Sequence, residues 1–195
     1  MSGETQKSRW LNPLLAALLV AGAQTAALGY MIESRASILR SGREVLLKTV
    51  PVDPRDLLRG DYVILSYDIS RIEPELFTGG FPAEEKEAQI YVRLEQQLDG
   101  FWTVTQAAFQ PLAAAGDTVV LRSLPFVYYP STPPAPVNVE YGIERFYVPE
   151  GEGRTLEEAR NAEALSVDVR VDAGGKAQIR EIAVNGSPVY EEPLY

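Results

Sequence analysis

The chain begins with one long apolar segment and continues as short segments in which hydrophobic and polar residues alternate. Residues 10–32 carry no charge. As a helix this run would extend about 34 Å, which is enough to cross the hydrocarbon core of a bilayer. Trp10 and Tyr30 stand near its ends, where amphipathic rings favour the headgroup region. The pattern predicts a transmembrane anchor over residues 10–32, behind an N-terminal tail of residues 1–9.

The same segment has one competing interpretation, a cleaved secretory signal, because the small residues at 25–27 suit a signal peptidase. The apolar run is longer than the hydrophobic region of a typical signal, which favours an uncleaved anchor. Lys and Arg residues lie on both sides of the run, so charge alone does not set its orientation. The short tail resembles the n-region of a signal anchor. We therefore expect a single-pass protein of the cytoplasmic (inner) membrane with its domain in the periplasm.

After the anchor, residues 33–43 predict a helical stalk that ends at Gly42, a residue suited to the left-handed conformation of a helix C-terminus. Runs of β-forming residues, several of them with alternating apolar and polar positions, then predict strands at 44–50, 61–69, 90–98, 101–107, 118–124, 137–148, 167–171 and 178–184. Asp99-Gly100 is expected to form a two-residue type I′ hairpin turn. Residues 155–164 form the one clear helix, and the tail SPVYEEPLY shows no clear period.

These elements predict a mainly β domain over residues 44–195, a small antiparallel barrel or sandwich with one short helix. The loop at 73–87 leaves two interpretations of Phe77 and Phe81, which could fold back on the core or face a partner. The Pro-rich stretch 126–136 contains Tyr128 and Tyr129, two aromatic residues that we consider as exposed candidates.

The composition removes several classes of function. The formal net charge is −9, from 27 acidic and 18 basic residues, so nucleic acid is not an expected partner. The chain has no Cys and no His. This excludes disulfides, thiolate nucleophiles and every catalytic triad that uses His. A calcium site at residues 150–152 lacks the Asp-rich loop spacing. We expect neither a metal nor a cofactor.

The stretch RGDYVILSY, residues 59–67, is the most patterned in the chain. Gly60 supplies turn freedom, and Asp61 can accept backbone N–H groups at the entry of the strand. One face of this strand is apolar throughout and is expected to lie in the core, namely Val63, Leu65, Tyr67 and Ile69. Tyr62 falls on the opposite face and is the better candidate for an exposed or cleft-lining ring.

These residues match a known pattern. Gly60-Asp61-Tyr62-x-x-Leu65-x-Tyr67 is the signature of the GDYXXLXY protein family, and on this complete match the chain is identified as a member. A second stretch, residues 141–151, resembles the later motif of the family. The resemblance implies a bacterial membrane-anchored protein without an assigned reaction. Because some members accompany multi-span membrane proteins, it also implies another membrane protein as partner.

Three functions from different classes follow as hypotheses. The first is a non-catalytic interaction or assembly module, accessory to a multi-span membrane protein, with candidate binding residues Asp61, Tyr62, Tyr128, Tyr129, Glu144 and Tyr147. The second is a ligand or glycan binding domain that uses exposed Tyr rings. The third is a hydrolase in which Asp61 and Glu144, with Glu150 as a further candidate, converge in one cleft.

The hydrolase hypothesis has a structural alternative. Asp61 could cap a turn, Glu144 could pair with a basic residue across the sheet, and Glu150 could lie in a surface turn. The position at which signal-peptidase-like serine enzymes carry their nucleophile is Val52 here, so a Ser–Lys dyad is unsupported. We therefore expect no catalytic residues.

Overall fold

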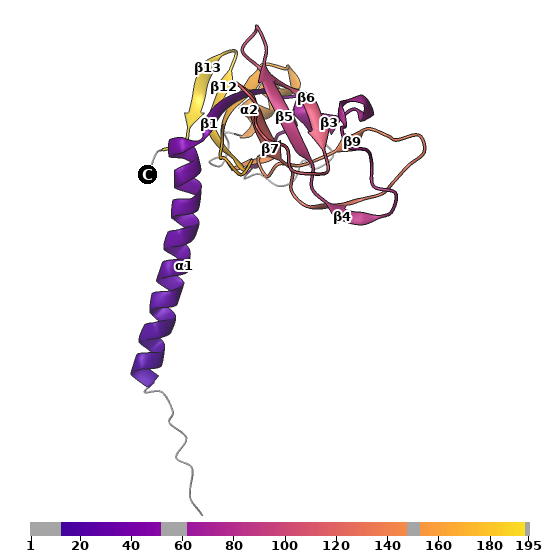
Figure 1. Ribbon diagram of the computed structural model, residues 1–195. Helices are drawn as coiled ribbons and strands as arrows, with labels where there is room; N and C mark the ends of the chain where they lie inside the picture. The colour runs from indigo at the N-terminus through magenta and orange to yellow at the C-terminus, as the bar shows by residue number, and fades with distance from the viewer. Residues whose placement is uncertain (1–12, 52–61, 148–152, 194–195) are drawn as a thin grey trace, which may run out of the picture. The chain divides into compact units, whose positions relative to one another are not determined.

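The computed structural model describes residues 13–51, 62–147 and 153–193, and the chain divides into two compact units, residues 1–36 and 37–195 (Figure 1). Within the second unit, antiparallel strands form one four-stranded sheet, one three-stranded sheet and three two-stranded sheets. The described strands close no barrel, and the sheets form a sandwich-like arrangement around one hydrophobic core. This architecture confirms the mainly β fold that the sequence predicts.

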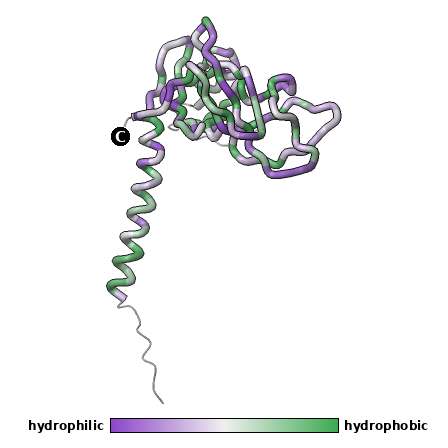
Figure 2. The backbone as a smooth tube through the Cα atoms, viewed as in Figure 1, coloured by the Kyte–Doolittle hydropathy of each residue, from purple (hydrophilic) through white to green (hydrophobic). Residues whose placement is uncertain are grey.

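The N-terminal helix α1 extends over Pro13–Ser41 and contains most of the predicted anchor and of the predicted stalk. By length and composition it could cross a membrane. Figure 2 shows its hydrophobic positions, in green, gathered toward its N-terminal half. The predicted tail and residues 10–12 of the predicted anchor lie outside the described residues.

Gly42 ends α1, but not through a left-handed conformation, so that prediction is wrong. Its N–H group donates to the carbonyl oxygen of Ile38 at 2.7 Å, and the chain enters the first strand directly. A Cβ atom at position 42 would lie 2.5 Å from that same oxygen and 3.0 Å from the Cβ atom of Arg170. Glycine is therefore needed here because two backbone segments approach closely.

The largest sheet has the strand order β1–β11–β12–β13, with the bounds Arg43–Lys48, Leu165–Val171, Ala177–Val184 and Ser187–Glu191. In β11 the side chains alternate strictly between buried and half-buried positions, as the sequence predicts. Asn185 and Gly186 have φ values of 51° and 74° and form the two-residue turn between β12 and β13. The sequence does not predict β13, because its mostly exposed residues show no alternation.

The second sheet has β5 (Tyr91–Gln96) between β6 (Trp102–Ala108) and β7 (Val119–Arg122). The β5–β6 hairpin lies where the sequence predicts it, but its turn differs. The N–H group of Gly100 donates to the carbonyl oxygen of Gln97 at 3.0 Å, and Gly100 has a φ of 90° while Asp99 has no positive φ. This is a type I turn followed by a glycine bulge instead of a type I′ turn, so only one position requires positive φ.

Three short ribbons complete the β structure: β2 (Tyr62–Ile64) with β10 (Arg145–Tyr147), β3 (Arg71–Ile72) with β9 (Val137–Asn138), and β4 (Lys86–Ala88) with β8 (Phe126–Tyr128). The remaining elements are the 3-10 helices η1 (Asp68–Ser70) and η2 (Pro74–Leu76) and the helix α2 (Gly153–Asn161). The predicted strand over 61–69 is thus shorter than expected, and the predicted strand over 137–148 is split into β9 and β10. The helix α2 confirms the predicted helix, with bounds shifted by a few residues.

Candidate functional site

The candidate site lies where the two motif-bearing segments of the chain pair with each other. Strands β2 and β10 are antiparallel, and Tyr62 lies opposite Tyr147 in the register. The N–H group of Leu65 donates to the carbonyl oxygen of Glu144 at 2.8 Å, which extends the pairing beyond the end of β2. Two stretches that are distant in the sequence therefore form one structural unit.

The inner face of this unit belongs to the hydrophobic core. Four alternate side chains are each only 1% exposed, and they are the ones that the sequence places on this face: Val63, Leu65, Tyr67 and Ile69. Phe146 from β10 lies opposite Val63 and is also buried. The alternation continues past β2, so the predicted orientation of the motif residues is confirmed although the strand is short.

Two buried tyrosines bond the segments to each other reciprocally. The hydroxyl of Tyr67 donates to the carbonyl oxygen of Ile143 at 2.7 Å, and the hydroxyl of Tyr141 donates to the carbonyl oxygen of Ile69 at 2.7 Å. Burial, and next the negative charge of Glu144, raises the pKa of both phenols well above the ordinary value. Both hydroxyls therefore remain protonated donors at physiological pH.

Glu144 organises the turn that separates β9 from β10. Its two carboxylate oxygens accept the backbone N–H groups of Tyr141 at 2.6 Å and of Gly142 at 2.8 Å. Gly142 has a φ of 86°, a conformation that glycine adopts readily. This capped turn splits the strand predicted over 137–148. Within the described residues the Glu144 carboxylate thus bonds to backbone, where the sequence suggests a basic partner across the sheet.

The outer face of the unit carries exposed apolar and aromatic side chains. The rings of Tyr62 and Tyr147 contact each other, with centroids 5.9 Å apart and planes tilted by 53°. Tyr147 is 70% exposed and Ile64 is 38% exposed. Burial in the core thus accounts for the inner residues of both motifs but not for these outer residues.

A groove of about 520 Å³ lies beside this outer face. Its lining combines apolar or aromatic side chains with charged ones, namely Tyr62, Ile64, Leu124, Glu140, Gly142, Glu144 and Arg145. We call this set, together with Tyr147, the motif groove. Of the six binding residues predicted from the sequence, it brings together Tyr62, Glu144 and Tyr147.

The segments that form this groove fall within a match to a known protein family. The model described as GDYXXLXY protein matches residues 24–182, from within α1 to β12. The chain belongs to the GDYXXLXY protein family. Both strands of the motif groove lie inside the matched region, and the match covers most of the chain. No curated protein and no solved structure matches this GDYXXLXY chain.

The GDYXXLXY strand β2 is also held by a residue that sequence reasoning missed. Arg160, in α2, is only 3% exposed, and its Nη1 atom donates to the carbonyl oxygen of Ile64 at 2.5 Å. Its Nε and Nη2 atoms donate to the side-chain oxygen of Asn161. A single Arg near the end of a polar helix carries no sequence signal for burial, because such residues are usually solvated.

The two adjacent tyrosines of the Pro-rich stretch have different environments. Tyr129 is 66% exposed, as expected, but Tyr128 is buried in β8, so the expectation of exposure is wrong for Tyr128. The ring of Tyr128 contacts those of Phe81 and Phe109, with centroids 6.3 Å and 4.9 Å away. Tyr128 is the last residue of β8, whereas Tyr129 follows the strand. Neither tyrosine lines the motif groove.

Phe77 and Phe81 fold back on the core, which resolves the two interpretations of their loop. Their rings contact each other and both contact Phe109. Asp61 and Glu150, the remaining candidates of the hydrolase hypothesis, lie outside the described residues.

Proposed function

We propose that this GDYXXLXY chain is a membrane-anchored, non-catalytic interaction module that binds a neighbouring membrane protein through the motif groove. The observation that carries the proposal is the exposed outer face of the β2–β10 unit. Core packing and backbone hydrogen bonds account for the inner residues of both motifs, whereas Tyr62, Ile64 and Tyr147 present apolar surface to solvent. Aromatic side chains in such positions are enriched in protein interfaces.

A non-catalytic role is supported by the use that the fold makes of Glu144. Both oxygens of Glu144 already accept backbone N–H groups and cap the 141–144 turn. The chain also has no His and no Cys that could replace it.

We propose that the occupant is an extended segment of the partner, bound along β10. Among the described strands, β10 pairs with β2 alone. Because Leu65 and Glu144 form a hydrogen-bonded pair, the alternation of an antiparallel ladder directs the backbone N–H and C=O groups of Arg145 and Tyr147 away from β2. No other described strand pairs with these groups, and we propose that they accept an added strand.

The side chains of the groove suggest the pattern of that segment. Apolar residues on alternate positions would pack against Tyr62, Ile64 and Leu124, while a basic residue would lie near Glu140 and Glu144. The anchor limits the search to partners at the membrane. We place the chain in the cytoplasmic membrane as a signal-anchored protein, with its domain on the periplasmic side.

The experiment uses a photo-crosslinking phenylalanine analogue placed at Tyr147 in the full-length protein, in its native membrane. Tyr129 is the matched control, because it is also a tyrosine and is almost equally exposed, at 66% against 70%. We expect position 147, but not 129, to form an adduct with a membrane protein, and mass spectrometry to map the adduct to an extended segment with apolar and basic residues.

A variant in the groove provides a further test. Tyr62→Ala should abolish the adduct at position 147 while the domain still folds, because Tyr62 lies in the groove and not in the core. The absence of a protein adduct at position 147, or equal adducts at 147 and 129, would contradict the proposal. Adducts with a saccharide or another small molecule would instead favour the ligand-binding hypothesis.

A further inference from the structure

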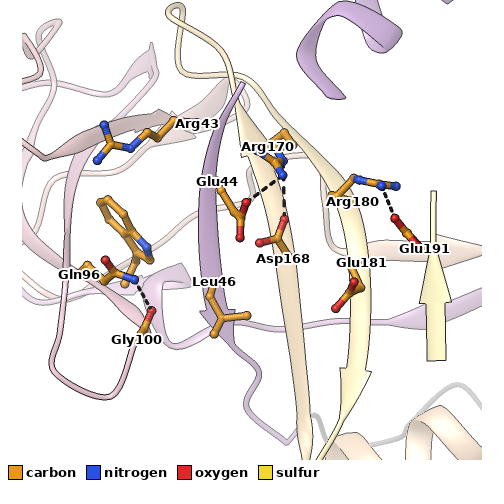
Figure 3. A pocket seen from close by; sticks show the side chains of 11 residues that line it. Arg43, Glu44, Leu46, Gln96, Gly100, Asp168, Arg170, Arg180, Glu181 and Glu191 are labelled. Carbon is orange, nitrogen blue, oxygen red and sulfur yellow. Dashed lines mark hydrogen bonds and ion pairs between the residues drawn. The ribbon is translucent and has the colours of Figure 1, made fainter. Parts of the chain in front are cut away.

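A second cavity, of about 570 Å³, lies on the polar face of the four-stranded sheet (Figure 3). The strand register places several charged side chains next to one another on this face. Glu44 of β1 lies opposite Arg170 of β11, and Asp168 of β11 lies opposite Glu181 of β12. Like charges directly opposite each other destabilise a sheet, so the carboxylates here need compensation.

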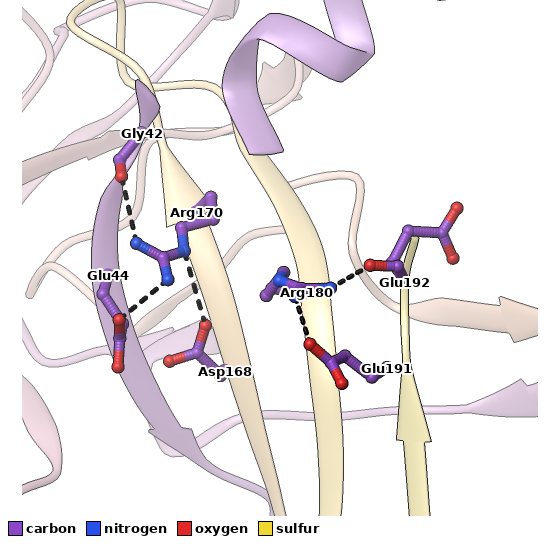
Figure 4. Close-up of polar contacts among 7 residues, drawn as sticks. All are labelled: Gly42, Glu44, Asp168, Arg170, Arg180, Glu191 and Glu192. Carbon is purple, nitrogen blue, oxygen red and sulfur yellow. Dashed lines mark hydrogen bonds and ion pairs between the residues drawn. The ribbon is translucent and has the colours of Figure 1, made fainter. Parts of the chain in front are cut away.

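Arg170 contacts two of these carboxylates, those of Glu44 and Asp168 (Figure 4). Its Nη2 atom lies 2.8 Å from a carboxylate oxygen of Glu44, its Nε atom lies 4.0 Å from Oδ1 of Asp168, and its Nη1 atom donates to the carbonyl oxygen of Gly42 at 3.5 Å. One guanidinium is thus shared between two carboxylates and the backbone that links α1 to β1.

The other two arginines that line the cavity have separate contacts. Arg180 binds the carboxylate of Glu191 and donates to the backbone carbonyl of Glu192, and Figure 4 shows it turned toward β13. Arg43 lies over the ring of Trp102, 5.9 Å from its centroid, and 3.6 Å from Asp117. Among the described residues that line the cavity, Arg170 is therefore the cation in contact with both Glu44 and Asp168.

Asp168 is far more buried than Glu44. Its side chain is 13% exposed, and its Oδ1 atom is buried without a hydrogen-bond partner in the described part of the chain, whereas the side chain of Glu44 is 63% exposed. Burial, and next the charge of Glu44, raises the pKa of Asp168 to about 7, and a side-chain hydrogen bond between Asp168 and Glu44 contributes in the same direction. Both carboxyl groups face the one guanidinium of Arg170, and a proton held between them would supply the donor that two carboxylates lack.

We propose that the Glu44–Asp168 pair is a proton-operated switch that controls how Arg170 holds the junction between α1 and β1. With the proton bound, Asp168 donates to Glu44, and Arg170 bonds Glu44 and the carbonyl of Gly42. When the proton passes to solvent, the two carboxylates repel each other. Glu44, the exposed partner, then turns toward water, Arg170 moves to Asp168, and its contact with Gly42 is lost.

The sign of the pH dependence follows from linkage. The native pKa of Asp168 lies above its ordinary value of 3.8, so the folded state binds more protons than the unfolded state between these values. The stabilisation is complete below the ordinary pKa and is lost as the pH rises through about 7. The contact between Arg170 and the carbonyl of Gly42 is therefore expected to be lost as the pH rises through about 7.

The test is a carboxyl-carbon NMR titration of the full-length protein in detergent micelles, with ¹³C-labelled Asp and Gly. We expect the Asp168 carboxyl to titrate with a midpoint near 7, and the Gly42 carbonyl resonance to shift with the same midpoint. An Asp168 carboxyl that titrates in the ordinary acidic range, or a Gly42 resonance that stays constant through the transition, would overturn the proposal. Because this measurement uses the wild-type chain, it does not depend on the folding of a variant.

Thermal unfolding of variants provides a second test. The melting midpoint of the wild type should fall as the pH rises from about 5 to about 9, and Asp168→Asn should remove most of this fall. Asp117→Asn is the matched control, because Asp117 contacts Arg43 at the rim and its side chain is fully exposed. Equal pH dependence in the wild type and in Asp168→Asn would refute the role of this pair.

Discussion

Replacing the two buried phenols by Phe tests whether the motif segments are held together as the structure indicates. Tyr67→Phe removes the donor to Ile143, and Tyr141→Phe removes the donor to Ile69, while both rings keep their packing. Each change leaves one buried carbonyl oxygen without this partner. The cost lies between the net value of a hydrogen bond and the penalty for an orphaned buried group, so we expect about 1.5 kcal/mol for each variant.

For a chain of this size that loss corresponds to a fall of roughly 3–6 °C in the melting midpoint. The assay is urea or thermal unfolding of the full-length protein in mild detergent, followed by the fluorescence of Trp102, which is buried in the core. A Trp10→Phe background removes the second Trp signal. Tyr147→Phe is the control, because that ring is 70% exposed and the change should stay within about 0.5 kcal/mol.

The double variant provides the sharper criterion. Both hydroxyls bond the same pair of segments, so losing one bond loosens the geometry of the other, and we expect the double variant to cost less than the sum of the single variants. If Tyr67→Phe is as mild as Tyr147→Phe, the carbonyl of Ile143 does not depend on that phenol. Strict additivity would show that the two bonds are independent and that the segments do not act as one unit.

Three further changes probe other parts of the fold, each measured by the same unfolding assay. Leu65→Asp puts a charge in the core and should leave the domain unfolded, so a cooperative melt at the wild-type midpoint would disprove the inward orientation of Leu65. Gly42→Ala places a Cβ atom 2.5 Å from the carbonyl oxygen of Ile38 and should cost about 1–3 kcal/mol, whereas an unchanged midpoint would show that the junction relaxes freely. Asp68→Asn should stabilise the domain more above neutral pH than in acid, because burial raises the pKa of Asp68 and its Oδ1 atom has no partner within the described structure; a larger gain in acid would reverse the argument.

The sequence predicts those strands that bury one face and expose the other. β5 and β11 lie close to the predicted ranges, because polarity changes at every second residue along them, and β6 follows as the hairpin partner of β5. β13 has no such contrast, since both of its faces are largely exposed. The short ribbons β3–β9 and β4–β8 join segments that are distant in the sequence, and no local pattern specifies such partners.

In the candidate site, too, some features follow from the local sequence pattern and others depend on the tertiary structure. The inward direction of Leu65 and Tyr67 and the outward direction of Tyr62 follow from alternation alone, and the structure confirms the placement. The capping role of Glu144 could not be predicted, because it depends on a turn that opens only when Gly142 takes a positive φ. The contact of Arg160 with β2 likewise depends on how α2 packs, which is a property of the tertiary structure.

The described residues of the signature therefore have separable roles. Leu65 fills the core, and Tyr67 fills it and also donates to the second motif through its hydroxyl. Tyr62 does neither, since its ring lies on the outer face against Tyr147 and lines the groove. Packing explains why the first two positions are apolar or aromatic, but it does not require an aromatic ring at position 62. Tyr62 contacts Tyr147 and lines the motif groove, and for this reason we propose position 62 as a binding position.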